Sequence, residues 1–193
     1  MELTWFRRPS ADQPGTLNAC YNAVDRHVVS GLADHPAITG SSTLDFAALL
    51  EQVAALAGAL QALGVEQGHL VRVLLDDPVE RVLAWLACER LGAVHGDVSS
   101  ASIVIASSDL DEPGVRARIL SGVPGSDPGR DVDWLLAIKA GREQPAGCTP
   151  VAPDAAAYVV AGEVVLLQEL GSHPSEVGEL HARLYDGLPL TLP

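Results

Sequence analysis

The residues that could support chemistry follow the best-defined strands that the sequence predicts. Residues 70–75, LVRVLL, are apolar and partly β-branched, which is typical of a parallel strand covered on both faces. A further strand is expected to end near His95, and Asp97 follows it. Open α/β sheets bind ligands at the carboxyl ends of their strands, so a His/Asp pair there could perform acid–base chemistry. The alternative is an inert, hydrogen-bonded histidine. His95 and Asp97 are therefore candidates only, and no catalytic set is supported.

A second group of polar residues lies directly after residues 70–75. Asp76, Asp77 and Glu80 offer carboxylate oxygens, which hard cations such as Mg²⁺ and Ca²⁺ prefer. Acidic residues are also favoured at a helix N-terminus, where they cap free N–H groups. We prefer the capping interpretation, and we predict no metal site and no cofactor.

The cysteines give no sign of a metal or disulfide framework. Cys20, Cys88 and Cys148 are three in number and widely spaced, which favours reduced thiols in a cytoplasm. Cys88 lies on the apolar side of its predicted helix, where we expect it to fill the core.

A βαβ unit must position these residues. After the strand at 70–75, Pro78 is suited to the first turn of a helix over residues 79–91, and Gly92 is a typical C-terminal stop. A parallel strand that ends at His95 would complete the unit with a right-handed connection. The sequence therefore predicts an α/β fold with a mostly parallel sheet flanked by helices.

The other expected elements are read from periodicity and capping residues. The helix over residues 45–63, with Ser42 or Thr43 as its N-cap, has so broad an apolar face that we expect cover on more than one side. The remaining predictions are helices at 16–29, 132–142 and 172–185 (capped by Ser172), strands at 37–39, 101–107 and 119–123, a helical turn within 108–118, and a hairpin over 155–167 around residues 161–163.

Composition bounds the class of protein. The 193 residues suit one domain over 1–193, with an N-terminal arm at 1–15 and flexible loops at 124–130 and 145–153. No apolar run approaches the roughly 20 residues of a membrane span, and no secretory signal is visible, so we expect a cytoplasmic protein. The net charge of −13 argues against binding to nucleic acid or to anionic membranes.

Four segments carry a resemblance to a known family. The chain resembles the acetyl- and propionyl-CoA synthetases of the adenylate-forming superfamily, and specifically their N-terminal subdomain. That family activates a carboxylic acid with ATP to an acyl-adenylate and then transfers the acyl group to CoA. The matching segments are LNACYNAVDRHV (17–28), LGVEQG (63–68), PVERVLAWLACERLGAVH (78–95) and DVDWLLAIKAG (131–141).

The chain departs from that family where the chemistry occurs. The family has a Ser/Thr/Gly-rich loop ending in lysine that wraps the ATP phosphates with backbone N–H groups. The matching stretch here keeps Tyr158, but Gly162 and Glu163 stand where that loop is expected. The CoA-binding segment after His95 is shortened, and the only lysine in the chain is Lys139. The resemblance therefore implies a truncated, degenerate relative that cannot adenylate on its own.

Three hypotheses remain open for function. The first is a pseudoenzyme that acts in assembly, as a homodimer or with a partner protein, because the apolar face of residues 45–63 needs cover. The second is a repurposed enzyme of small-molecule biosynthesis, with an acyl or polyketide-type ligand near His95 and Asp97. The third is one half of a split adenylating enzyme. We favour the first.

Overall fold

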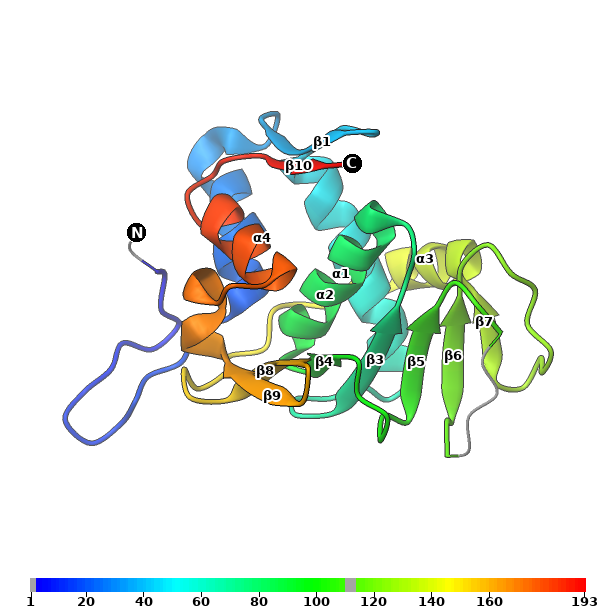
Figure 1. Cartoon of the computed structure of the whole chain (residues 1–193). Helices are drawn as coiled ribbons and strands as arrows, with labels where there is room; N and C mark the ends of the chain where they lie inside the picture. Colours follow the sequence, from blue (N-terminus) through cyan, green and yellow to red (C-terminus); the bar gives the residue numbers. More distant parts are fainter. Residues whose placement is uncertain (1–2, 110–113) are drawn as a thin grey trace.

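The computed structural model describes residues 3–109 and 114–193 (Figure 1). The helices are α1 (Phe46–Ala62), α2 (Pro78–Leu91), α3 (Trp134–Glu143) and α4 (Glu176–Leu184), with π-helical segments η1 (Tyr21–Asp25) and η2 (Val28–Leu32) and a 3₁₀ segment η3 (Leu167–Ser172). The strands are β1 (Pro36–Gly40), β2 (Leu44–Asp45), β3 (Leu70–Leu74), β4 (Val94–Gly96), β5 (Ile103–Ala106), β6 (Ala117–Leu120), β7 (Asp131–Asp133), β8 (Ala156–Val160), β9 (Glu163–Leu166) and β10 (Leu190–Leu192).

Seven strands form the main sheet, in the order β7-β6-β5-β3-β4-β8-β9. All neighbours pair in parallel except β8 and β9, which form an antiparallel hairpin. The register places Val71 of β3 opposite both His95 of β4 and Ile103 of β5. This arrangement confirms the predicted α/β fold with a mostly parallel sheet and the hairpin near residues 161–163.

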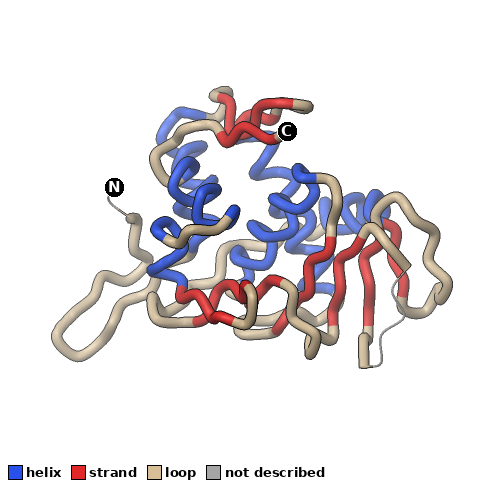
Figure 2. The backbone as a smooth tube through the Cα atoms, viewed as in Figure 1, coloured by secondary structure: helices blue, strands red, loops and turns tan. Residues whose placement is uncertain are grey.

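The helices gather on one side of this sheet (Figure 2). α2 contacts β3 and β4, α3 contacts β6 and β7, and α1 packs against both α2 and α3. The expectation that the helix near residues 45–63 is covered on more than one side is confirmed. On the opposite sheet face lies a smaller apolar cluster, to which no described helix contributes: Leu74, Val104, Ala106, Val115, Leu120 and Val123.

Local capping signals explain α2. Oδ1 of Asp77 accepts hydrogen bonds from the backbone N–H groups of Val79 and Glu80, at 2.8 and 3.0 Å. Pro78 occupies the first turn, and Gly92 ends the helix in the left-handed region with φ of 69°. The capping interpretation of Asp77 is confirmed.

Two predicted N-caps are wrong. α1 is capped by Asp45, whose Oδ1 accepts from Ala48 N at 2.7 Å, and not by Ser42 or Thr43, because Leu44 and Asp45 are extended and pair with β1. The last helix begins at Glu176 with Ser175 as its cap, because residues 167–172, Ser172 included, form the separate segment η3.

One strand is shifted from its prediction. β6 runs over Ala117–Leu120 and not over 119–123, because its pairing with β5 starts at Ala117 and the chain turns at Gly122, where φ is 72°. Within the stretch 108–118, where a helical turn is expected, residues 110–113 lie outside the described residues, and the described residues 108–109 and 114–118 form no helix.

A second, three-stranded sheet was mostly absent from the predictions. It has the order β10-β1-β2, with β1 parallel to β10 (Figure 1). The main core draws on buried side chains from Leu17 to Leu190. Among the described residues, no helix has the length and apolar character to cross a membrane.

Candidate functional site at the carboxyl ends of the parallel strands

The carboxyl ends of β3 and β5 form the point at which the connections of the sheet diverge. β3 leads to β4 on one side, whereas β5 leads to β6 on the other. Ligands of open α/β sheets bind at such a point. Asp76 follows β3 and Ser107 follows β5, and the Asp76 N–H donates to Ser107 Oγ at 3.0 Å. The topology therefore places the acidic residues where a ligand site is expected.

Asp76, Asp77 and Glu80 do not converge as a set of three ligands in the described part of the chain. The oxygen of Asp77 is engaged in capping α2, and the only set of three His, Cys, Asp or Glu ligands that converges among the described residues lies elsewhere. Glu80 is partly buried, and its pKa is raised. Burial raises this pKa by more than the hydrogen bond with Ser121 lowers it. The contacts of Asp77 are those of a helix N-cap.

His95 lies in the interior and not at the edge of the sheet. Its side chain is fully buried, and its Nε2 is 2.9 Å from Oε1 of Glu89 on α2. Its Nδ1 has no hydrogen-bond partner among the described residues. The ring lies beside Tyr158 of β8, with 5.0 Å between centroids and a tilt of 34° between the ring planes. Solvent and substrate cannot reach His95 in this conformation.

Asp97 lies on the other face of the sheet from His95. Its carboxylate is 69% exposed and binds Arg72 Nε of β3 at 2.7 Å. Arg72 follows Val71, which faces the helices, so the alternation of side chains along the strand directs Arg72 to the helix-free face. The backbone bends at Gly96, where φ is 136°, and carries Asp97 to that face. The structure therefore does not bring His95 and Asp97 together.

A buried network that the sequence did not reveal holds His95. The two carboxylate oxygens of Glu89 contact His95 Nε2 and His181 Nε2 of α4, each at 2.9 Å, and all three side chains are buried. Burial alone would raise the pKa of Glu89, but His181 and His95 outweigh it and lower that pKa to about 2. For His181 the effect of burial is opposite, since burial lowers the pKa of an imidazole. The Glu89 charge outweighs burial and raises the pKa of His181 above its ordinary value. In the sequence, the one feature that could have indicated this network is Glu89, an acidic residue on the apolar face of α2 beside Leu86.

The stretch that matches the phosphate loop of the CoA synthetases is a tight hairpin. Ala161 and Gly162 form the turn between β8 and β9, with φ of 51° and 82°. Positive φ at both residues is the geometry of a two-residue β-hairpin. Tyr158 points into the protein beside His95 and Trp85, whereas Gly162 and Glu163 are exposed.

Another cluster combines residues that are distant in sequence. Cys20 and Asp25 from the first helical segment meet Cys148 from the connection between α3 and β8. Arg90 of α2 donates to Asp25 Oδ2 at 2.8 Å and to Cys20 Sγ at 3.6 Å. The wide spacing of the cysteines concealed this convergence. Cys88 is fully buried in the core, as predicted.

Comparison with known proteins gives matches over part of the chain. Residues 25–102, from the end of η1 to the loop before β5, match the model of the AMP-binding enzyme family. The chain is 32% identical over 146 residues to the rat mitochondrial acyl-CoA synthetase short-chain family member 3, covering 68% of this chain and 21% of that protein.

Bacterial relatives match as well. An acetyl-coenzyme A synthetase of Streptomyces avermitilis is 34% identical over 177 residues, covering 86% of this chain and 24% of the relative. The corresponding enzyme of Streptomyces coelicolor is 39% identical over 121 residues, or 56% of this chain and 19% of the relative. The chain is a relative of the acetyl- and short-chain acyl-CoA synthetases of the AMP-binding enzyme family, and it spans about a fifth to a quarter of their length.

Proposed function

We propose that these 193 residues act as a non-catalytic, acyl-CoA synthetase-like protein that does not form acyl-adenylates by itself and functions by association. The observation that carries the proposal is the turn at Ala161–Gly162 with Glu163 beside it. A loop that wraps phosphates needs several N–H groups that point at one anion, and a two-residue turn offers too few. The Glu163 carboxylate adds charge repulsion at the same position.

The position of the lysine also supports a lack of adenylation. Lys139 is exposed on α3, which packs on β6 and β7 at one edge of the sheet. The hairpin of β8 and β9 forms the opposite edge. Lys139 therefore cannot replace the loop lysine that the resemblance leads us to expect.

The biosynthetic alternative has less support. His95 is fully buried and bound to Glu89, and Asp97 is paired with Arg72 on the other sheet face. Acid–base work by this pair would need both groups within reach of one substrate.

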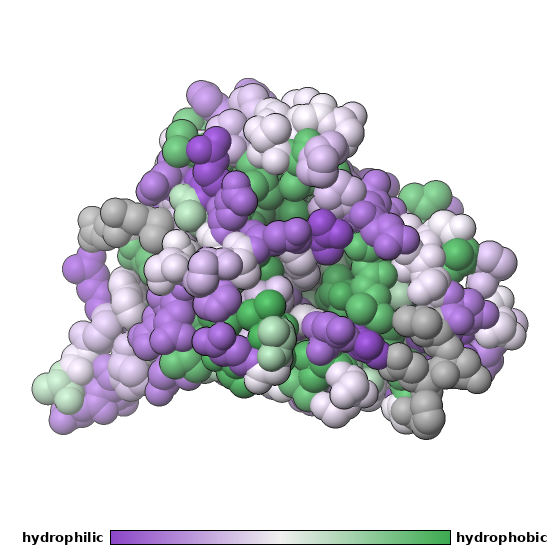
Figure 3. All heavy atoms as spheres, in the orientation of Figure 1, coloured by the Kyte–Doolittle hydropathy of each residue, from purple (hydrophilic) through white to green (hydrophobic). Residues whose placement is uncertain are grey.

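The surface that we assign to association differs from the one expected from the sequence. The apolar face of α1 is covered by α2 and α3 within the chain. Parallel sheets are normally covered on both faces, yet the described helices that pack on the main sheet lie on one side. Figure 3 shows apolar atoms gathered over the carboxyl-terminal parts of β3 and β5. We propose that a second copy of the chain covers this helix-free face, where the partly exposed Leu74, Val115 and Val123 surround Val104, Ala106 and Leu120, which are buried within the chain itself.

ATP-dependent chemistry provides the direct test. We expect no pyrophosphate exchange with ATP, Mg²⁺ and acetate or propionate, and no rise in melting temperature when ATP is added. An acetyl-CoA synthetase measured in parallel is the positive control.

Two variants make this test specific to the hairpin. Should ATP stabilise the protein, Glu163→Gln would strengthen the effect if the nucleotide lies at the turn, and Glu143→Gln on α3, an equally exposed change, would not. Stabilisation by ATP that Glu163→Gln strengthens would contradict the proposal. So would pyrophosphate exchange faster than the rate measured without protein.

A further inference from the structure

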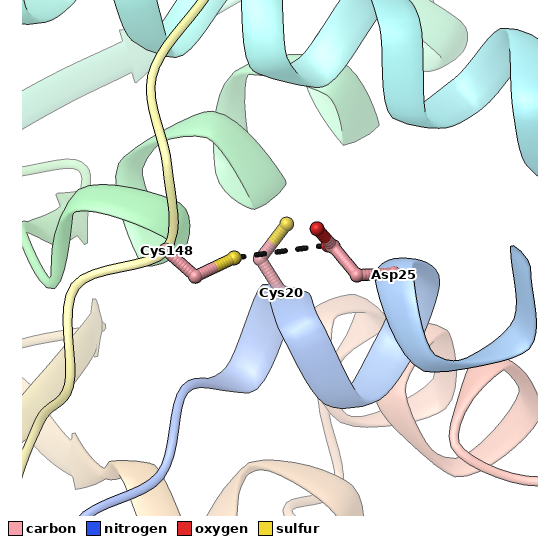
Figure 4. Close-up of side chains that lie close together, drawn as sticks. All are labelled: Cys20, Asp25 and Cys148. Carbon is pink, nitrogen blue, oxygen red and sulfur yellow. Dashed lines mark hydrogen bonds between the residues drawn. The ribbon is translucent and has the colours of Figure 1, made fainter. Parts of the chain in front are cut away.

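Two thiols and a carboxylate point toward a common position on one side of the core (Figure 4). Cys20 precedes η1, Asp25 is the last residue of η1, and Cys148 lies in the connection between α3 and β8. One ligand atom from each lies within 4.8 Å of the other two, and Cys148 Sγ is 3.7 Å from Asp25 Oδ2. Ligands of one tetrahedral metal ion have such spacings, since metal–sulfur and metal–oxygen bonds are about 2.0–2.3 Å long.

The local charges fit a divalent cation. With both thiols deprotonated, Cys20, Cys148 and Asp25 together carry three negative charges. Arg90 supplies one positive charge through its contacts with Asp25 Oδ2 at 2.8 Å and with Cys20 Sγ at 3.6 Å. The remaining two negative charges would be balanced by a divalent ion.

The shell around the cluster is already ordered. The Arg90 Nε donates to the Ala146 carbonyl at 2.7 Å, and the Thr149 N–H donates to the Arg90 carbonyl at 2.8 Å. These bonds fix the backbone on both sides of Cys148. Outer contacts of this kind hold metal ligands in their orientation.

The cluster is also reachable from outside. Cys20 is fully buried and the Asp25 side chain is 15% exposed, while Cys148 is half-buried. A cavity of about 390 Å³ beside it is lined by Arg90, Ala146 and Gly147, among others. The cavity borders residues next to the cluster, and the partial exposure of Asp25 and Cys148 is what leaves these two ligands accessible to an ion.

We propose that Cys20, Asp25 and Cys148 bind a thiophilic divalent metal ion of the Zn²⁺ class. Two sulfurs and one oxygen are a donor set that zinc accepts, and a water molecule would complete four-coordination. Binding replaces the two thiol protons, which are released to solvent, and no redox step is involved. The ion would tie η1 to the connection between α3 and β8.

Cobalt is the probe that reports on the sulfur ligands. We expect Co²⁺, titrated into the full chain under a non-chelating phosphine reductant, to give a sulfur-to-cobalt charge-transfer band that saturates at one ion per chain. Zn²⁺ should abolish the band by displacement and raise the melting temperature by several degrees.

Variants identify the ligands. Cys148→Ser should remove the band and weaken Zn²⁺ binding at least tenfold, and Asp25→Asn, which keeps the side-chain shape, should weaken it without loss of fold. Cys88→Ala is the matched control, because Cys88 is a buried cysteine outside the cluster, and it should leave the band unchanged.

Several results would overturn the assignment. The absence of a charge-transfer band in the wild-type chain would do so, as would a band that persists in Cys148→Ser. A thiol titration of the denatured, metal-free protein should find three thiols, and a value of one would indicate a Cys20–Cys148 disulfide instead. None of these readouts depends on nucleotide binding or on association through the helix-free face.

Discussion

The Glu89 carboxylate binds two imidazoles that come from different elements, His95 of β4 and His181 of α4. All three side chains are buried, so the negative charge of Glu89 is little screened by solvent and depends on these two contacts. The network therefore connects α4 to the main sheet through charge as well as through apolar packing.

This network predicts a pH dependence of stability with a definite sign. His181 has a pKa above its ordinary 6.5 in the folded chain, so its contribution is complete below about pH 6.5 and is lost as the pH rises through the raised value. Glu89 has a folded pKa of about 2 against 4.5, so its contribution is present above pH 4.5 and is lost toward pH 2. For these two groups, the free energy of unfolding should be greatest between about pH 4.5 and 6.5 and should fall in alkali, as measured by urea denaturation.

Removal of the Glu89 charge should abolish the fall in the free energy of unfolding that His181 causes as the pH rises above about 6.5. We expect Glu89→Gln to lose on the order of 3 kcal/mol at pH 6, because it leaves His181 buried without its counter-charge. Glu66→Gln, a change at an exposed position, is the control and should follow the wild type. An unchanged alkaline decline in Glu89→Gln would assign the pH dependence to other groups.

The predictability of the candidate site differed from residue to residue. Asp77 could be assigned as a cap because its two partners, Val79 and Glu80, lie only two and three residues further along the chain. His95 could be placed on a strand, but the contact of its partner Glu89 with His181 joins residues far apart in sequence, which no local pattern reports. The same reason explains why Cys20 and Cys148 gave no sign of their proximity.

Close contact between α1 and α3 depends on positions that have no side chain. A Cβ added to Gly141 of α3 would overlap the Ala55 carbonyl oxygen of α1, and one added to Gly58 would overlap the Gln144 carbonyl oxygen. Both obstacles are backbone atoms, so neither can move aside without a shift of one helix.

Gly141→Ala should therefore destabilise the chain although alanine favours helices. We expect a loss of about 1–3 kcal/mol, the usual effect of overpacking, when the free energy of unfolding is measured by urea denaturation. Gly147→Ala is the matched control, because nothing lies within 4 Å of its added Cβ, and it should be nearly neutral. A neutral Gly141→Ala would mean that the two helices can separate without cost.

At the level of elements, the predictions succeeded where the determining signals were local. Asp77, Pro78 and Gly92 fix both ends of α2 within the chain itself. The predicted caps at Ser42 or Thr43 and at Ser172 failed because the residues after Thr43 form β2 and because Ser172 itself belongs to η3. β10 was not predicted because its partner β1 lies about 150 residues earlier.

The whole molecule is asymmetric, because the helices that pack on the main sheet lie on one face and a small apolar cluster lies on the other. If a second copy covers that face, light scattering should give twice the mass of one chain. Val123→Glu should then shift the equilibrium toward monomer at least tenfold. Leu135→Glu is the control, because Leu135 is 73% exposed on α3, and should leave the mass unchanged. A wild-type chain that stays monomeric at every concentration would contradict the assignment.

The pairing of β1 with β10 also has a consequence for the order in which the molecule folds. Ile38 lies opposite Leu190 in a parallel register, so the three-stranded sheet joins residues that leave the ribosome at very different times. Closure of so long a loop is entropically costly and is associated with slow folding. The α2 unit can form early, whereas β1 must wait for residues 190–192 before its second edge is paired, so that edge is open to chaperones during synthesis.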